Sequence, residues 1–226
     1  MKKQHWLTIF LFVLVVHIAG IVSGNEPLQN ISKPLLIPAL IGFFLFGING
    51  QQGSFKKWIL LALFFSWAGD VLLMFQPKND IFFLLGLSAF LLAHIFYIVF
   101  FNQVRFRENI KSNPWFLLLV VIYYAVLISL LSPWLGDMKI PVRIYGIVIS
   151  FMFMLAMHML FLKNKISGKW LFVGALLFVL SDSVLAINKF YQSFDAAGII
   201  IMLTYGLAQL FIVKGAIDYI NAGEKE

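Results

Sequence analysis

Residues 57–76 read KWILLALFFSWAGDVLLMFQ, an apolar run that a single acid, Asp70, interrupts near its end. A second run of the same kind, residues 168–188, reads GKWLFVGALLFVLSDSVLAIN and contains Asp182. An α-helix needs about 20 mostly apolar residues to cross the hydrocarbon core of a bilayer. Because a carboxyl group inside such a helix costs roughly 3 kcal/mol even on insertion scales, both acids are candidates for a functional site.

The composition extends this interpretation to the whole chain. Of 226 residues, 62% are hydrophobic and 12% are charged, which is too little polar surface for a soluble globule. We predict an all-α polytopic membrane bundle of eight transmembrane helices, forming a single integral membrane domain over residues 1–226. The runs are continuously apolar, unlike the alternating strands of a transmembrane barrel. The predicted spans are 6–23, 34–50, 57–76, 80–101, 114–132, 140–162, 168–188 and 195–217.

The net charge of +7 lies at the ends of the predicted spans and not in one dense patch, so we expect no nucleic-acid partner. Assigning the amino terminus and every second loop to one side collects 12 of the 17 basic residues there. The positive-inside rule then predicts a multi-pass protein with both termini in the cytoplasm, in the inner membrane if the source is bacterial. The twelve are Lys2, Lys3, Lys56, Lys57, Arg105, Arg107, Lys111, Lys163, Lys165, Lys169, Lys214 and Lys225. The other five are Lys33, Lys78, Lys139, Arg143 and Lys189.

The two acids lie 112 residues apart, half the chain, in similar contexts. This spacing indicates a weak internal repeat of helices one to four against five to eight, with both halves running in the same direction. Asp70 precedes Lys78 by eight residues and Asp182 precedes Lys189 by seven. At 1.5 Å per residue both acids lie about 10 to 12 Å from the outer helix ends, so they can meet in one site. Alternatively, each acid only hydrogen-bonds a neighbouring helix.

The first span could also be a cleaved signal peptide, since Lys2 and Lys3 precede an apolar stretch that ends in Val22-Ser23-Gly24. The repeat favours its retention, because the first half would otherwise lack one helix. There is no cysteine, so disulfides, thiolate metal sites and cysteine nucleophiles are excluded.

Other polar residues occur on helix faces that could line an interior. His94 and Tyr97 are three residues apart and share a face, and Tyr205 and Gln209, four apart, share another. Each could equally be an ordinary hydrogen-bond donor between helices. Lys33 is expected at the outer start of the second helix, as a snorkelling anchor, a cation for a phosphate, or the partner of an acid.

The prolines are expected in loops or first helical turns, where the missing N–H costs little, with Lys33-Pro34 opening the second helix. They are Pro27, Pro34, Pro38, Pro77, Pro114, Pro133 and Pro141. We predict no metal site, because no H-x-E or H-x-x-x-H spacing occurs. We also predict no cofactor, since no nucleotide fingerprint or phosphate loop is present.

The chain resembles the YhhN family of eight-helix membrane proteins, whose characterised members are lysoplasmalogenases. The similar pieces are Lys33-Pro34-Leu35, Gly69-Asp70-Val71-Leu72-Leu73, Gly86-Leu87 with Phe90, His94 and Tyr97, Gly174-Ala175 with Phe178, Ser181, Asp182, Leu185 and Ala186, and Tyr205 with Gln209. The resemblance implies hydrolysis of the vinyl ether of a lysoplasmalogen, giving a fatty aldehyde and glycerophosphoethanolamine or glycerophosphocholine. It also implies a lysophospholipid and membrane lipids as partners.

The chemistry of that bond suits two buried acids. Vinyl-ether hydrolysis begins with proton transfer to the β-carbon, and a carboxyl group in an apolar interior keeps its proton more readily than one in water. We therefore expect Asp70 and Asp182 to form the acid/base pair. The supporting residues would be Lys33, His94, Tyr97, Ser181, Tyr205 and Gln209.

Two other hypotheses fit the sequence. Parallel repeats and membrane acids also occur in proton-coupled carriers of small lipids or metabolites. Carriers commonly break helices at the midplane, which the expected proline positions argue against. In the third hypothesis, the acids only hold the bundle together.

Overall fold

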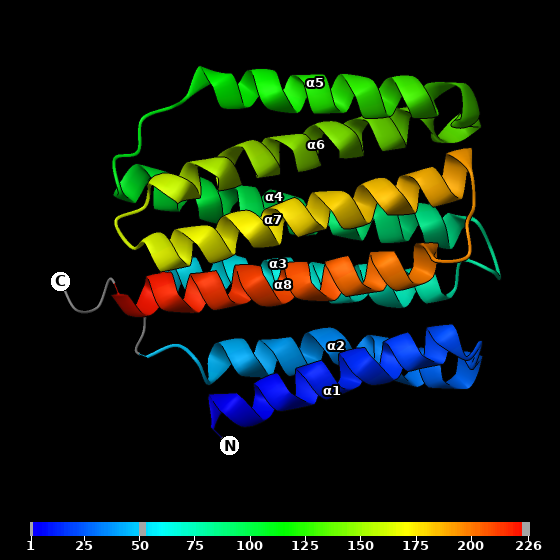
Figure 1. Ribbon diagram of the computed structural model, residues 1–226, viewed down its shortest axis with the longest axis horizontal. Helices are drawn as coiled ribbons and strands as arrows, with labels where there is room; N and C mark the ends of the chain where they lie inside the picture. Colours follow the sequence, from blue (N-terminus) through cyan, green and yellow to red (C-terminus); the bar gives the residue numbers. More distant parts are fainter. Residues whose placement is uncertain (1, 50–52, 223–226) are drawn as a thin grey trace.

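The computed structural model describes residues 2–49 and 53–222, and Figure 1 shows them as a bundle of eight long α-helices. All eight are long and apolar enough to cross a membrane, which confirms the all-α class and the eight expected spans. Residue 50, the predicted end of the second span, and Lys225 lie outside the described residues. The helices are α1 Lys3–Val22, α2 Glu26–Leu45, α3 Gly53–Met74, α4 Ile81–Arg107, α5 Pro114–Leu131, α6 Lys139–His158, α7 Lys165–Ala186 and α8 Ala197–Ala222.

Consecutive helices run in opposite directions, and both chain ends lie at the same end of the bundle (Figure 1). The hairpins α1–α2, α3–α4 and α7–α8 pack closely, while α5 contacts mainly α6 at an edge. Only 11% of the α5 span is buried, against 28–56% in the other seven. The outer position of α5 leaves most of its surface for lipid.

The helix bounds agree with the expected repeat. Both α3 and α7 have 22 residues, and each begins and ends 112 residues from the other. Asp70 lies four residues before the end of α3, and Asp182 lies four residues before the end of α7. The two acids therefore occupy equivalent positions on equivalent helices that run in the same direction (Figure 1).

The second helix corrects the expected proline positions. It begins at Glu26, capped by Asn25, so Lys33 lies two turns inside it, and Pro34 and Pro38 are in its interior. Pro38 has no N–H for the carbonyl of Pro34, but the indole Nε1 of Trp67 on α3 donates to that oxygen at 3.0 Å. A neighbouring helix thus satisfies the freed carbonyl, which is how transmembrane helices tolerate proline.

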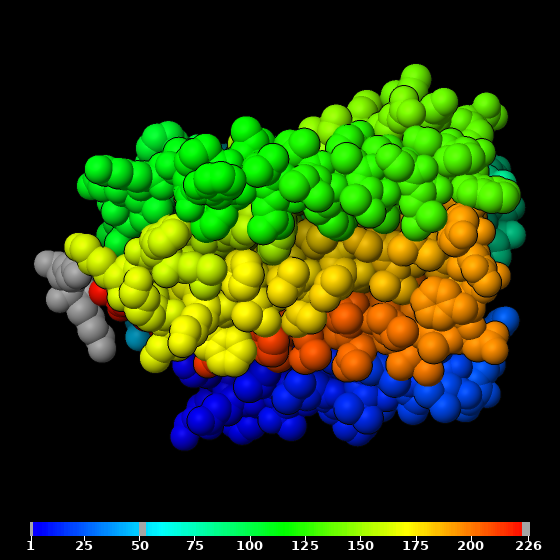
Figure 2. Space-filling view, turned by 45° about the horizontal axis from the view of Figure 1, so that its top comes forward, coloured from blue at the N-terminus to red at the C-terminus, as the bar shows by residue number. Residues whose placement is uncertain are grey.

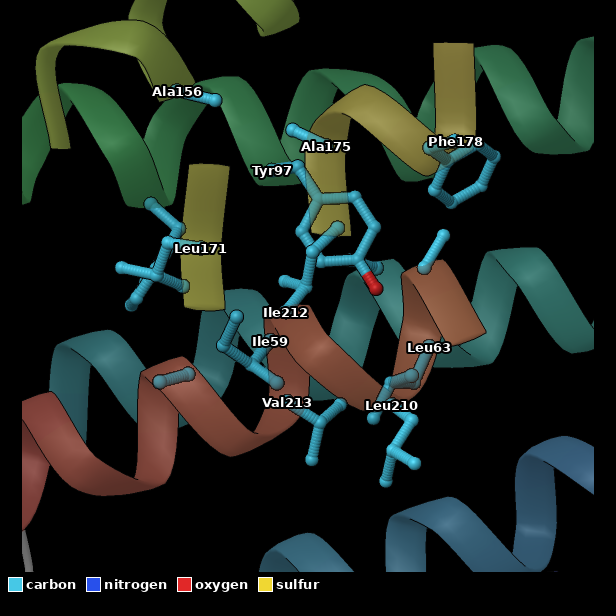
Figure 3. Close-up of a cluster of buried hydrophobic side chains, with 14 of the residues drawn as sticks. Ile59, Leu63, Tyr97, Ala156, Leu171, Ala175, Phe178, Leu210, Ile212 and Val213 are labelled. Carbon is cyan, nitrogen blue, oxygen red and sulfur yellow. The ribbon is translucent and has the colours of Figure 1, made fainter. Parts of the chain in front are cut away.

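The core that fixes the bundle is formed mainly by α3, α4, α7 and α8, as Figure 3 shows around Tyr97, Leu171 and Phe178. At the α7–α8 contact, a Cβ on Gly174 would lie 2.7 Å from the backbone nitrogen of Ile212. The absence of a side chain at Gly174 therefore allows the two backbones to approach closely.

Candidate active site

Asp70 is sealed inside the bundle, with only 2% of its surface exposed. Its Oδ2 accepts a 2.7 Å hydrogen bond from the hydroxyl of Tyr205 on α8. Lys33 on α2 lies near enough to interact electrostatically with the carboxylate. Of the alternatives for Lys33, its position on α2 therefore favours the partner of an acid.

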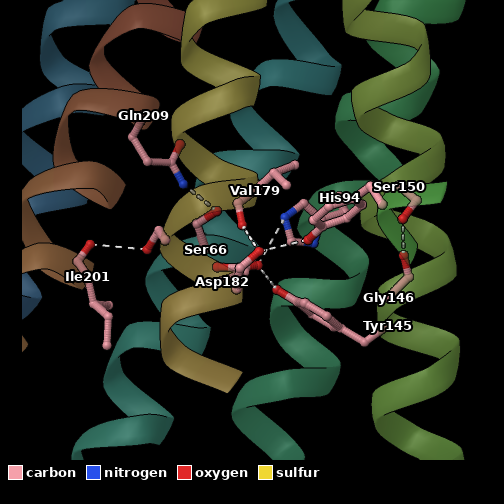
Figure 4. A network of polar contacts seen from close by, with 12 residues as sticks. Ser66, His94, Tyr145, Gly146, Ser150, Val179, Asp182, Ile201 and Gln209 are labelled. Carbon is pink, nitrogen blue, oxygen red and sulfur yellow. Dashed lines mark hydrogen bonds and ion pairs between the residues drawn. The ribbon is translucent and has the colours of Figure 1, made fainter. Parts of the chain in front are cut away.

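Asp182 has a different environment. Its Oδ2 accepts a hydrogen bond from the hydroxyl of Tyr145 on α6, and Nε2 of His94 on α4 lies 3.8 Å from the same oxygen (Figure 4). The Asp182 side chain is 13% exposed. Neither ring nitrogen of His94 has a hydrogen-bond partner within the described residues, although the ring is fully buried. Polar capacity is therefore left over beside Asp182, where a water or a ligand could use it.

The two acids belong to one cluster. Asp70 and Asp182 are close enough to interact electrostatically, and so are the tyrosines that hold them, Tyr205 and Tyr145. Two neighbouring carboxyl groups do not both ionise cheaply in an apolar interior, so this pair favours a shared proton.

A buried polar chain extends from Asp70 toward the opposite end of the bundle. The hydroxyl of Tyr97 donates to Oε1 of Gln209 at 2.5 Å, and Nε2 of Gln209 donates to Ser66 Oγ at 2.9 Å (Figure 4). Gln209 also forms a hydrogen bond with Tyr205, the residue that donates to Asp70. Tyr97 and Gln209 therefore contact the acid cluster through Tyr205.

Ser181 lies elsewhere. Its hydroxyl donates to the backbone carbonyl of Ile201 on α8 at 3.1 Å, and so it links α7 to α8 (Figure 4). The structure thus brings Lys33, His94, Tyr205 and both acids together, while Ser181 joins two helices beside them.

A narrow cavity of about 40 Å³ lies between α5, α6 and α7, and Asp182 is part of its wall. Tyr145, Tyr123 and Ser183 also line it, and the hydroxyls of Tyr123 and Ser183 are 2.7 Å apart. The remaining lining is almost entirely apolar. At roughly 10 to 15 Å³ for each water centre, the cavity holds a few waters beside the carboxyl group.

Sequence reasoning missed Tyr145, the direct donor to Asp182. The signal was the half-chain spacing, because Tyr145 stands 112 residues after Lys33, as Asp182 stands 112 after Asp70. Ser66 was also missed, although it lies one helical turn before Asp70.

Metal ligation has little support from the donor set. No three His, Asp or Glu side chains gather as possible ligands in residues 2–49 and 53–222. The arrangement that is present can move a proton at Asp182, hold water beside it, and place a second carboxyl group behind it.

Comparison with known proteins gives a consistent set of matches. The model of the YhhN family matches residues 28–216. Lysoplasmalogenase TMEM86B of Homo sapiens is 32% identical over 218 residues, covering 94% of this chain and 86% of that protein. Lysoplasmalogenase of Mycobacterium tuberculosis is 30% identical over 197 residues, covering 86% and 72%. No solved structure matches the chain.

Proposed function

This chain belongs to the YhhN family, and from that membership we propose that it hydrolyses the vinyl ether bond of lysoplasmalogens. The products are a fatty aldehyde and a glycerophosphoethanolamine or glycerophosphocholine. The relatives that match most of the chain are named lysoplasmalogenase, which supports this reaction. The observation that carries the proposal is the carboxyl group of Asp182 in the wall of a narrow, mostly apolar cavity, with a second acid behind it.

In the proposed mechanism, protonated Asp182 transfers its proton to the β-carbon of the vinyl ether. The double bond becomes an oxocarbenium ion, whose positive charge the nearby Asp70 carboxylate stabilises. Water then adds to the α-carbon and gives a proton to the Asp182 carboxylate, which restores the acid. The resulting hemiacetal breaks its bond to the glycerol oxygen, which takes up a proton, and the aldehyde is released.

The surrounding residues take supporting roles in this proposal. Lys33 favours the ionised form of Asp70 by its charge, and Tyr205 donates a hydrogen bond to the same carboxylate. Tyr145 orients Asp182, and the unpartnered nitrogens of His94 hold the water. The difference in exposure between the two acids supports this division, because substrate can reach Asp182 more readily than Asp70.

The test is aldehyde release from a lysoplasmalogen by the purified protein. General acid/base groups typically contribute about 10² to 10⁴ in rate, so Asp182→Asn and Asp70→Asn should each lower kcat by that range. Asp137→Asn, in the exposed α5–α6 connection, is the matched control and should keep the wild-type rate. Normal turnover by both buried-acid variants would overturn the assignment.

A proton-coupled carrier is the second candidate, and one observation favours it. Pro34 and Pro38 interrupt the interior of α2 beside Lys33, as broken helices do in carriers. Uptake of a lysolipid into proteoliposomes without aldehyde formation would support the carrier and exclude the hydrolase.

A further inference from the structure

A second apolar cavity continues the one that Asp182 lines. It holds about 150 Å³ between α5 and α6, and its wall includes Leu117, Val121, Phe151 and Met154. The two cavities share one lining residue, Tyr124. Together they form a groove along α5 from Leu131 to Leu117, about 21 Å at 1.5 Å per residue.

The residue between the cavities is weakly held. The hydroxyl of Tyr124 reaches the carbonyl oxygen of Arg143 at 3.5 Å, which is long for a hydrogen bond. Its ring packs against Gly146, where a Cβ would approach Tyr124 Cε2 to 3.0 Å. A rotation of this half-buried side chain would therefore join the two cavities without breaking a strong contact.

The groove has polar character at one end only. At that end Arg143 is exposed and donates to Ser132 at 3.2 Å, and the next position inward is Asp182. Beyond Tyr124 the lining is apolar except for Ser150. A molecule that fits has an anionic group, a short polar connection and a long apolar chain, in that order.

The wall formed by α5 faces lipid. Figure 2 shows α5, in green, lying along α7, in yellow, at the surface of the bundle. Because α5 is the least buried of the eight helices, a chain can enter from the side by a small displacement of α5 away from α6. The groove is longer than one leaflet of the hydrocarbon core, roughly 15 Å.

We propose that the groove between α5 and α6 binds the aliphatic chain of a single-chain phospholipid, and that Tyr124 and Val121 determine which chain lengths place the vinyl ether at Asp182. This inference rests on the proposed function for the reaction at Asp182. The chain-binding part stands on the continuity of the two cavities and on their apolar lining. Arg143 is the cation at the headgroup end.

The test fills the far part of the groove. Val121 is 51% exposed and lines the second cavity, whereas its neighbour Ile122 is 56% exposed and lies outside both linings. Val121→Trp should lower the ratio of kcat/KM for a long-chain over a short-chain lysoplasmalogen by at least about tenfold, since misplacing the reacting bond by an ångström is that costly. Ile122→Trp should leave the ratio unchanged. Leu117→Trp is a second groove variant, should Val121→Trp not fold.

A binding measurement separates this inference from the proposed reaction. Long-chain and short-chain 1-O-alkyl lysophospholipids lack the double bond and are not substrates, so their effect on the thermal midpoint reports binding alone. Val121→Trp should remove the extra stabilisation given by the long-chain analogue, and Ile122→Trp should keep it. If the wild-type protein releases no aldehyde but shows this pattern, the reaction fails and the groove stands. If Val121→Trp leaves both ratios unchanged, or affects the two chain lengths equally, the groove assignment is wrong.

Discussion

Tyr97 donates a 2.5 Å hydrogen bond to Gln209, and the two residues stand 112 positions apart, at equivalent places in the two halves of the chain. Both are fully buried, one on α4 and one on α8. The hydrogen bond therefore joins the last helices of the two repeats across the interior. It connects the halves at the depth of the residues that hold Asp70.

The Tyr97–Gln209 contact should show energetic coupling. Interhelical hydrogen bonds in membranes average about 0.6 kcal/mol and reach about 1.7. Tyr97→Phe should lower the free energy of unfolding by about 1 kcal/mol, and Gln209→Leu by more, because Gln209 also contacts Ser66. In a double-mutant cycle measured by denaturation in detergent, the two losses should add to less than their sum. Strict additivity would contradict the contact.

Two buried histidines should behave in opposite ways. His94 has no hydrogen-bond partner within the described residues, and so His94→Phe should keep or slightly raise the thermal midpoint. It should also lower aldehyde release by at least about tenfold, because the water beside Asp182 loses its ligand.

His158 is the structural counterpart. It contacts the backbone of Asn113 at 3.1 Å and of Met154 at 2.8 Å. His158→Phe should lower the free energy of unfolding by about 1 to 3 kcal/mol while the rate per folded molecule stays near wild type. Full activity in His94→Phe would remove that residue from the site.

The α7–α8 contact should depend on Gly174. A Cβ there would meet backbone atoms of Ile212 and Ala208 at 2.7 and 2.8 Å, and backbone cannot rotate away as a side chain can. We expect Gly174→Ala to cost about 1 to 3 kcal/mol in unfolding free energy. Gly198→Ala, whose Cβ would meet only Ile21 at 3.4 Å, should be neutral or slightly stabilising. Equal thermal midpoints for the two variants would contradict the close packing.

The orientation is directly testable because the chain has no cysteine. We propose that both termini lie in the cytoplasm, so Asp137 lies outside and Lys163 inside. A membrane-impermeant maleimide added to intact cells should label Asp137→Cys, and it should label Lys163→Cys only after permeabilisation. Both positions are exposed in the structure, so access differs only by side. The reverse labelling pattern would invert the orientation.

Much of the fold followed from the sequence, since eight apolar runs and the two matched acids fix the helices and their direction. The second helix was wrong by two turns because proline normally ends a helix, and nothing in residues 26–38 reveals the indole of Trp67 that satisfies the Pro34 carbonyl. Tyr145 was missed because a single tyrosine among apolar residues has no local signature. Its contact with Asp182 depends on the packing of α6 against α7, which periodicity does not define.

The difference in burial between α1 and α5 has a consequence for how a duplicated protein becomes directional. Two copies of one four-helix unit would offer two equivalent entrances, one to each acid. Here α1 packs on both α2 and α8, whereas the corresponding helix α5 contacts mainly α6. One half has thus become a closed scaffold that sets the charge around Asp70, and the other has kept a side door to the lipid.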